Sequence, residues 1–250
     1  MLFRSYANRA PRPPVTRTVG IDVGLKDFAV TSDGEHFEHP KLLKKAQRRL
    51  RRLQRKQSRR VKRSSNWKKA VRAVNLQHFK VKCQRQDFLH KLTTHLVKTK
   101  PDAKFVVEDL NVKGMVQNHK LARSISDSGW GEFSRQLQYK AGEERFKKAD
   151  RWFPSSRLCP CCLQINHDLT LKDRVFACPT CGHVKDRDEN ASENLSKYEQ
   201  YVADGVYRPR TRRELPASSA GSNACGEEGP QAASVKQELN TMELIEAPRR

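Results

Sequence analysis

The sequence lacks any long apolar run. No segment approaches the 18 or more apolar residues of a membrane-spanning helix, and the N-terminal stretch MLFRSYANRAPRPPV has no apolar signal-peptide region. Aromatic residues are scarce, at 7% of 250 residues, and only 36% of residues are apolar. These absences predict a cytoplasmic protein with no membrane partner, built from one modest core and a small appended domain.

Acidic residues are missing from one long segment. Between Lys41 and Arg72 there are 16 Lys and Arg and no Asp or Glu, which accounts for most of the net charge of +22. Such a segment suits contact with a polyanion such as a nucleic-acid backbone, and the plainer alternative is a solvated, partly disordered arm. The cations expected to contact nucleic acid are Arg48, Arg49, Arg51, Arg52, Arg55, Lys56, Arg59 and Arg60.

Apolar alternation predicts strands near the start of the chain. In RTVGIDVGLKDFAVTSDGEHFEHP, Val19, Ile21 and Val23 share one face, and the triplet SDG predicts a hairpin turn. Further along, AKFVVEDL is typical of a strand that is buried on both faces, and DRWFPSS is expected to be a short strand.

Helical spacing predominates elsewhere, at residues 41–99, 130–149 and 185–204. Within 41–99, two apolar stripes are expected to be buried: Leu42, Leu43, Ala46, Leu50 and Leu53, then Val71, Val74, Phe79, Phe88, Leu92 and Leu96. Residues 1–16 and 205–250 are expected to be disordered. The order of elements predicts an α/β domain with a mixed sheet.

The cysteines form two tight pairs. Cys159 and Cys162 are followed, after 15 residues, by Cys178 and Cys181, which is the spacing of a four-cysteine zinc site. Four thiolates complete a tetrahedron and leave no open position for water, so the predicted zinc ion is structural. Cys161 lies inside the first pair and leaves the choice of ligands there open.

Several carboxyl groups occupy positions suited to chemistry. Asp22 lies between Gly20 and Gly24, which were expected to leave its strand face bare for an ion or phosphate. Glu108 ends a buried strand, and Asp186 and Asp188 open a helix. Considered one at a time, acids in the positions of Glu108, Asp186 and Asp188 often serve only as helix caps or interact with the helix dipole. If three carboxylates converge, however, their repulsion favours hard cations such as Mg²⁺ or Mn²⁺, a pair of which cleaves phosphodiesters.

Three motifs, GIDVG, FVVEDL and CPTCGHVKDRDENASENL, together resemble a RuvC-type nuclease domain with an inserted zinc ribbon. Their order is similar to that of the TnpB (OrfB) proteins of bacterial insertion sequences, which are relatives of the type V CRISPR nucleases. The resemblance implies a ribonuclease-H-like fold and metal-dependent, RNA-guided DNA cleavage associated with transposition, near the nucleoid. It also implies that Asp22, Glu108 and Asp188 are the catalytic acids, and it matches Cys159, Cys162, Cys178 and Cys181 to the zinc ligands.

The resemblance divides the chain into four parts after residue 16. Residues 17–156 correspond to the nuclease core with 41–99 as a basic helical insertion, 157–184 to the zinc ribbon, 185–204 to the last nuclease segment and 205–250 to a tail. Only 18 residues precede Val19, where family members usually carry a β-barrel and a helical domain, so the chain is expected to be either an N-terminally truncated gene product or a remnant.

Further departures are Leu163, which replaces a usual glycine, and the additional thiol of Cys161. Two rival functions remain: a non-catalytic nucleic-acid-binding zinc protein derived from such a nuclease, and a DNA-joining transposase that uses the same acids.

Overall fold

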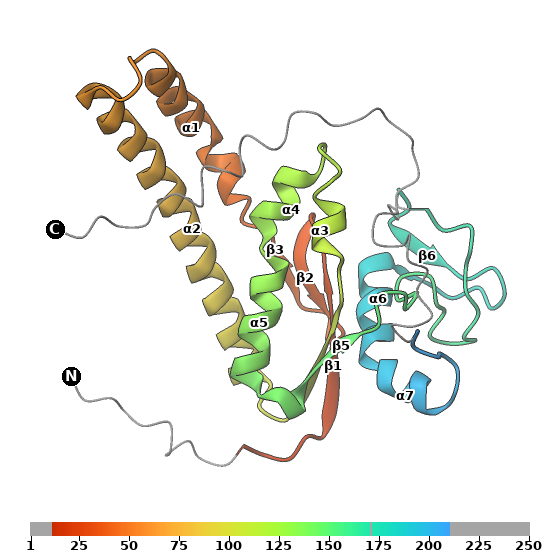
Figure 1. The fold of residues 1–250 in the computed structure, drawn as a ribbon. Coiled ribbons are helices and arrows are strands. Elements are labelled where there is room, and N and C mark those ends of the chain that lie inside the picture. Colours follow the sequence, from red (N-terminus) through yellow and green to blue (C-terminus); the bar gives the residue numbers. More distant parts are fainter. Residues whose placement is uncertain (1–11, 171, 211–250) are drawn as a thin grey trace.

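A five-stranded mixed sheet forms the centre of the protein in the computed structural model, which describes residues 12–170 and 172–210 (Figure 1). The disorder expected at 1–11 and 211–250 lies outside the described residues. None of the described helices is both long enough and apolar enough to cross a membrane.

The sheet has the strand order β3-β2-β1-β4-β5. Strands β1 (Arg17–Val23), β2 (Asp27–Thr31) and β3 (His36–Glu38) are antiparallel neighbours, joined after β2 by the predicted turn at Gly34, whose φ is +80°. Strands β4 (Ala103–Glu108) and β5 (Phe146–Ala149) continue the sheet in parallel with β1. The predicted α/β class and mixed sheet are therefore confirmed.

Helices α2 (Ser65–Thr99) and α5 (Trp130–Ala141) cover one face of the sheet (Figure 1). The main core lies here and includes Ile21, Phe105, Val107, Leu96 and Leu137, all nearly or fully buried. Two short helices, α3 (Val112–Met115) and α4 (Ala122–Ser128), lie between β4 and α5. Because Val106 instead joins a second core on the other face, β4 is buried on both sides, as its sequence predicted.

The basic insertion is a helical hairpin that projects from this layer (Figure 1). Helix α1 (Leu42–Ser58) packs against α2, with Leu50 buried between them. At its base, the buried carboxylate of Asp127 accepts hydrogen bonds from the Leu43 backbone N–H and the Arg85 guanidinium, each 2.9 Å long. One point of the prediction was wrong: Phe79 does not belong to the buried stripe, because its side chain is 61% exposed.

Helices α6 (Arg187–Ser196) and α7 (Tyr198–Ala203) cover the opposite face. The backbone of α6 lies directly on β1 at Gly20, where a Cβ atom would come within 2.0 Å of the Ser192 carbonyl oxygen and 2.4 Å of the Ser196 nitrogen. This corrects the expectation of a bare strand face: Gly20 makes room for a helix, and Gly24 faces the Asp27 carbonyl in a turn.

A smaller unit follows β5 and contains the four paired cysteines and Cys161. Strands β6 (Val175–Ala177) and β7 (Val184–Asp186) pair as an antiparallel hairpin, and Leu158 pairs with Ile165 in an isolated bridge. Phe176 and Leu169 give this unit a very small apolar core beside Cys159 and Cys178. Its last strand leads directly into α6, so the unit is continuous with the helix on the second face.

Four local expectations differ from the structure. The helix predicted at 130–149 ends at Ala141, and a 3-10 turn (Glu143–Arg145) leads into β5; residues 150–156 are turns rather than a strand. Residues 12–16 are held in place, for example by the Thr16 N–H bonded to the Asp102 carbonyl. Residues 205–210 also pack, because Tyr207 joins the second core. Both segments that were predicted to be disordered therefore include residues that make defined contacts.

Gly20→Ala tests the close approach of α6 to β1. The added methyl group would overlap backbone atoms that cannot move aside independently, so we expect a loss of about 3 kcal/mol or more in the free energy of unfolding, measured by urea denaturation. Gly131→Ala in α5 is the control, because its Cβ would meet open space and the helix should be unchanged or slightly more stable. Equal stabilities for the two variants would contradict this packing.

Candidate functional site

Asp22 and Glu108 lie beside each other at the ends of two parallel strands. In the register of β1 and β4, Ile21 is paired with Val107, and the next residue on each strand is one of the two acids. Strand alternation places Asp22 on the same face as Gly20 and places Glu108 on the same face as Val106, which is the face covered by α6. Both carboxyl groups are half-buried.

Asp188 reaches this position from the first turn of α6, about one turn before Ser192, which contacts Gly20. The neighbouring candidate has a different role. Asp186 is the N-cap of α6, and its carboxylate accepts hydrogen bonds from the backbone N–H groups of Asp188 (2.9 Å) and Glu189 (3.3 Å). The Asp186 carboxylate therefore caps the start of α6, whereas Asp188 lies toward Asp22.

Asp22 interacts electrostatically with both of the other carboxyl groups. The pKa of Asp22 lies well above its usual value, first because of burial and then because of the negative charges of Glu108 and Asp188. Burial, followed by the charge of Asp109, raises the pKa of Glu108 to about 7. The site therefore concentrates negative charge that the surrounding protein only partly compensates.

Arg187 supplies the nearest compensation. Its Nε lies 3.6 Å from the Asp188 carboxylate, and its charge lowers the pKa of Asp22 against the larger opposing effects. The same guanidinium contacts the Thr170 carbonyl at 3.4 Å, and its backbone N–H donates to the Arg174 carbonyl at 2.8 Å. Arg187 thus connects the carboxyl groups with the cysteine unit.

The four paired cysteines form a compact cluster. The sulfur atoms of Cys159 and Cys181 are 3.6 Å apart, those of Cys162 and Cys178 are 3.4 Å apart, and all four lie within 4.8 Å of one another. A tetrahedral zinc ion with Zn–S bonds of about 2.3 Å requires sulfurs about 3.8 Å apart. The Cys181 and Thr180 backbone N–H groups lower the pKa of Cys178 to about 6, which favours the thiolate. Cys161 is exposed and outside the cluster.

Sequence reasoning missed two buried asparagines that join the cysteine unit to the core. Asn190 and Asn194 are one turn apart on α6 and fully buried, and their amide groups donate to the Leu158 carbonyl at 3.0 and 2.7 Å. Asn194 also donates to the Ser155 carbonyl at 2.8 Å. Two asparagines four positions apart in a helix are the signal that would have indicated this role, because asparagine has a poor helix propensity.

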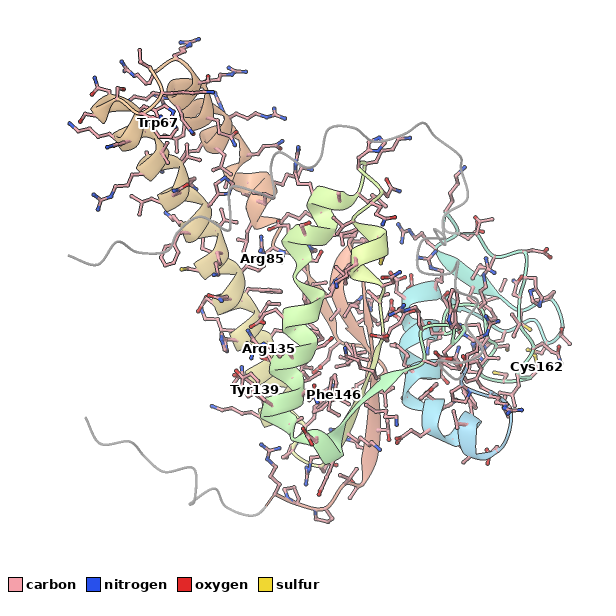
Figure 2. All side chains as sticks on the ribbon, viewed as in Figure 1. Trp67, Arg85, Arg135, Tyr139, Phe146 and Cys162 are labelled. Atoms are coloured by element: carbon pink, nitrogen blue, oxygen red, sulfur yellow. The ribbon has the colours of Figure 1, made fainter. Side chains whose placement is uncertain are left out.

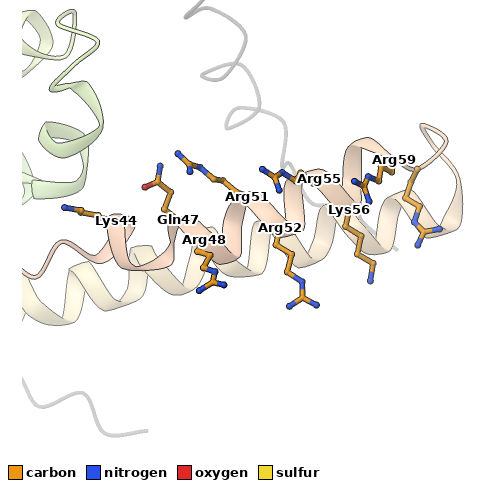
Figure 3. A pocket seen from close by; sticks show the side chains of 9 residues that line it. Lys44, Gln47, Arg48, Arg51, Arg52, Arg55, Lys56 and Arg59 are labelled. Atoms are coloured by element: carbon orange, nitrogen blue, oxygen red, sulfur yellow. The ribbon is translucent and has the colours of Figure 1, made fainter.

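The predicted cations lie along α1 at a large surface cavity of about 1040 Å³ (Figure 3). Its lining includes seven of the eight predicted residues, all but Arg49, together with Lys44 and Gln47. Like charges three or four positions apart on a helix repel each other, so this row weakens α1 unless a polyanion screens it. The cavity along this row is far more suited to phosphates than to any apolar ligand.

Comparison with known proteins identifies two family segments. Residues 4–119 match the family model described as "Probable transposase" (OrfB_IS605), and residues 130–195 match the model of a Cas12f1-like TNB domain. Among solved structures, that of a CRISPR-Cas12f ternary complex is similar with a TM-score of 0.58 and 18% identity, over 75% of this chain and 40% of that one. This likeness concerns the fold alone.

Curated relatives are more similar in sequence. A "Putative RNA-guided DNA endonuclease" of Streptomyces pristinaespiralis is 43% identical over 188 residues, which is 74% of this chain and 46% of the relative. The protein of the same description from Escherichia coli K12, InsQ, is 34% identical over 74% of this chain and 50% of its own length. The chain spans about half the length of the curated relatives it matches.

The fold and site thus define an α/β protein of the Cas12f-like structural class with a four-cysteine cluster. Within that class, the chain belongs to the TnpB (OrfB) family, as its three motifs indicated.

Removing one cysteine tests the metal assignment. Cys178→Ser should reduce zinc content from near one ion per chain to near zero and unfold residues 157–184, because zinc binding contributes about 10–16 kcal/mol to such units. Cys161→Ser, which changes a thiol outside the cluster, should retain the ion. Zinc content is measured by mass spectrometry. If Cys161→Ser removed zinc and Cys162→Ser kept it, the ligand assignment would be wrong.

Glu108→Gln tests the raised pKa of Glu108, which burial causes first, through the pH dependence of stability. The pKa of Glu108 is near 4.5 in the unfolded protein and about 7 in the folded protein. Between these two pH values the folded protein therefore loses stability as pH rises, because the unfolded state gives up its proton more readily. The variant, which stays neutral, should therefore be about 1–3 kcal/mol more stable than the wild type at pH 8 and similar at pH 4.5. Urea denaturation without added Mg²⁺ or Mn²⁺ measures this.

The control is Glu38→Gln on the exposed edge of β3, which should change stability little at either pH. A Glu108→Gln variant that is less stable than the wild type at pH 8 would show that the ionised carboxylate stabilises the fold.

Proposed function

We propose that this chain provides the nuclease half of an RNA-guided DNA endonuclease. In this proposal residues 17–156 form a ribonuclease-H-like (RuvC) core with 41–99 inserted, 157–184 a zinc ribbon and 185–204 the last core segment. The observation that carries it is the meeting of Asp22, Glu108 and Asp188, from three distant segments, on one face of the sheet. A sheet that passes from antiparallel β3-β2-β1 to parallel β1-β4-β5 supports the fold assignment.

The donor set fits hard divalent cations. Three half-buried carboxyl groups whose charges repel one another form an oxygen-rich site, and Mg²⁺ or Mn²⁺ held there would relieve the repulsion. Such ions, when bound, activate water and stabilise the leaving oxygen in phosphodiester cleavage. The protein's own contribution is positional: two neighbouring strands hold Asp22 and Glu108, and the start of α6 holds Asp188.

The cysteine cluster supports a zinc ribbon with a structural role. Its four sulfurs lie within 4.8 Å of one another, close enough to bind one tetrahedral ion, and the unit around them has too small an apolar core to fold without a cross-link. Asn190, Asn194 and Arg187 join this unit to α6, so zinc would help to place Asp188 without taking part in cleavage.

DNA and a guide RNA are the partners that we assign. The cation row of α1 offers a surface for phosphates, and the relatives bear names that describe RNA-guided action on DNA. A role in transposition agrees with the transposase family model.

A non-catalytic nucleic-acid-binding protein is the rival function, and the unrelieved repulsion weighs against it. A protein that only bound nucleic acid would gain stability by losing Asp22 or Glu108. A DNA-joining transposase would need the same acids, and it would differ in its product.

The assay for this function is cleavage of labelled DNA by the chain with its guide RNA and Mg²⁺ or Mn²⁺. Asp188→Ala should abolish cleavage, at least about 100-fold, while zinc content and nucleic-acid affinity stay nearly unchanged. Asp186→Asn is the matched control, because asparagine preserves the helix cap while it removes a nearby charge. Cleavage that survives in Asp188→Ala and fails in Asp186→Asn would shift the assignment by two residues; joined strands would indicate the transposase.

A further inference from the structure

The outer face of α2 carries an exposed apolar groove near the tip of the hairpin. Leu76 and Phe79 are 58% and 61% exposed, and Trp67 lies in the first turn of the helix (Figure 2). The groove is shallow, with a volume of about 440 Å³, and its lining consists of Trp67, Lys68, Val71, Arg72, Asn75, Leu76 and Phe79.

Packing among the described residues does not explain this groove. The buried residues in the same part of α2 are Ala70, Val74, Gln77 and Val81, which form a stripe on the other side of the helix, where α1 packs. Among the described residues, none of the three apolar clusters includes Trp67, Leu76 or Phe79. Large exposed apolar side chains gathered in this way mark a binding surface.

Charge decides what kind of partner fits. The charged residues in the lining of the groove, Lys68 and Arg72, are both cations, and the sequence has no acidic residue between Glu38 and Asp87. A second copy of the chain would bring two basic surfaces together and repel. A polyanion with flat apolar faces matches both features, and single-stranded nucleic acid is such a polymer because its unpaired bases stack on aromatic rings.

We propose that this groove is a stacking platform for unpaired bases of a single-stranded RNA, separate from the cation row of α1. The proposal rests on the proposed function for the kind of polymer bound. Trp67 and Phe79 are about 18 Å apart along the helix axis, so they serve different bases, and the cations between them meet the phosphates.

The position of α2 favours RNA over the DNA strand that is cut. Helix α2 packs on the face of the sheet opposite to the one that carries Asp22, Glu108 and α6. A strand stacked on the outer side of α2 is therefore directed away from the carboxyl groups. A guide strand, which stays intact, suits this place.

Binding of labelled oligouridine RNA, measured by fluorescence anisotropy without divalent ions, tests the platform. Phe79→Ala and Trp67→Ala should each weaken binding about 5- to 100-fold, while binding to duplex RNA stays within about twofold. The dependence of affinity on salt should keep its slope, whereas the double variant Arg51→Gln, Arg55→Gln should lower that slope by about two.

Two further variants separate stacking from other effects. Phe79→Leu keeps an apolar side chain without a ring, so it should lose as much affinity as Phe79→Ala. Tyr139→Ala is the matched control, because Tyr139 is a 51% exposed aromatic on α5 with the Arg135 guanidinium 5.6 Å from its ring centroid. It should bind like the wild type.

Several results would overturn the platform: unchanged affinity in Phe79→Ala, equal weakening for duplex RNA, full affinity in Phe79→Leu, or a loss seen with single-stranded DNA alone. A change from dimer to monomer in Phe79→Ala, measured by sedimentation, would show that a second copy occupies the groove. Because these assays measure binding without cleavage, they stay informative if Asp188→Ala fails to affect cleavage.

Discussion

The contact between α6 and β1 at Gly20 is the constraint on which the site depends. A helix backbone lies within 2.0 Å of where a Cβ would be, so only glycine permits this approach. The contact brings the start of α6, with Asp188, to the strand end that carries Asp22. The buried amides of Asn190 and Asn194 hold the cysteine unit to the same helix. One helix therefore positions both the carboxyl site and the proposed zinc site.

Helix α6 also relates the carboxylates to the cysteines. They are chemically separate, because soft thiolates and hard carboxylates select different ions, and among the described residues only the cysteines form a cluster tight enough for one tetrahedral ion. They are mechanically connected, because Arg187 contacts both Thr170 and Asp188. The first turn of α6 is therefore in contact with both units.

In the proposed function, nucleic acid contacts two separate helix surfaces of the hairpin. The row on α1 consists of charged groups whose attraction weakens with salt, whereas the groove on α2 adds flat apolar groups whose contribution does not. Anchoring by Asp127 at the base fixes the orientation of both surfaces relative to the sheet. The proposed guide and target strands thus meet different faces of one molecule.

By itself, the sequence determined the strands around Asp22 and Glu108, the helical character of the basic segment, the α/β class and the cysteine pairs, since each depends on local periodicity or spacing. Only the tertiary structure decided the rest. Gly20 looked like an open approach to Asp22, yet it accommodates a helix that lies 172 residues later in the chain. Phe79 was predicted to be buried because helical spacing shows which residues share a face of the helix. It does not show which face packs against the rest of the protein. Long-range contacts carry this information, and no local pattern records them.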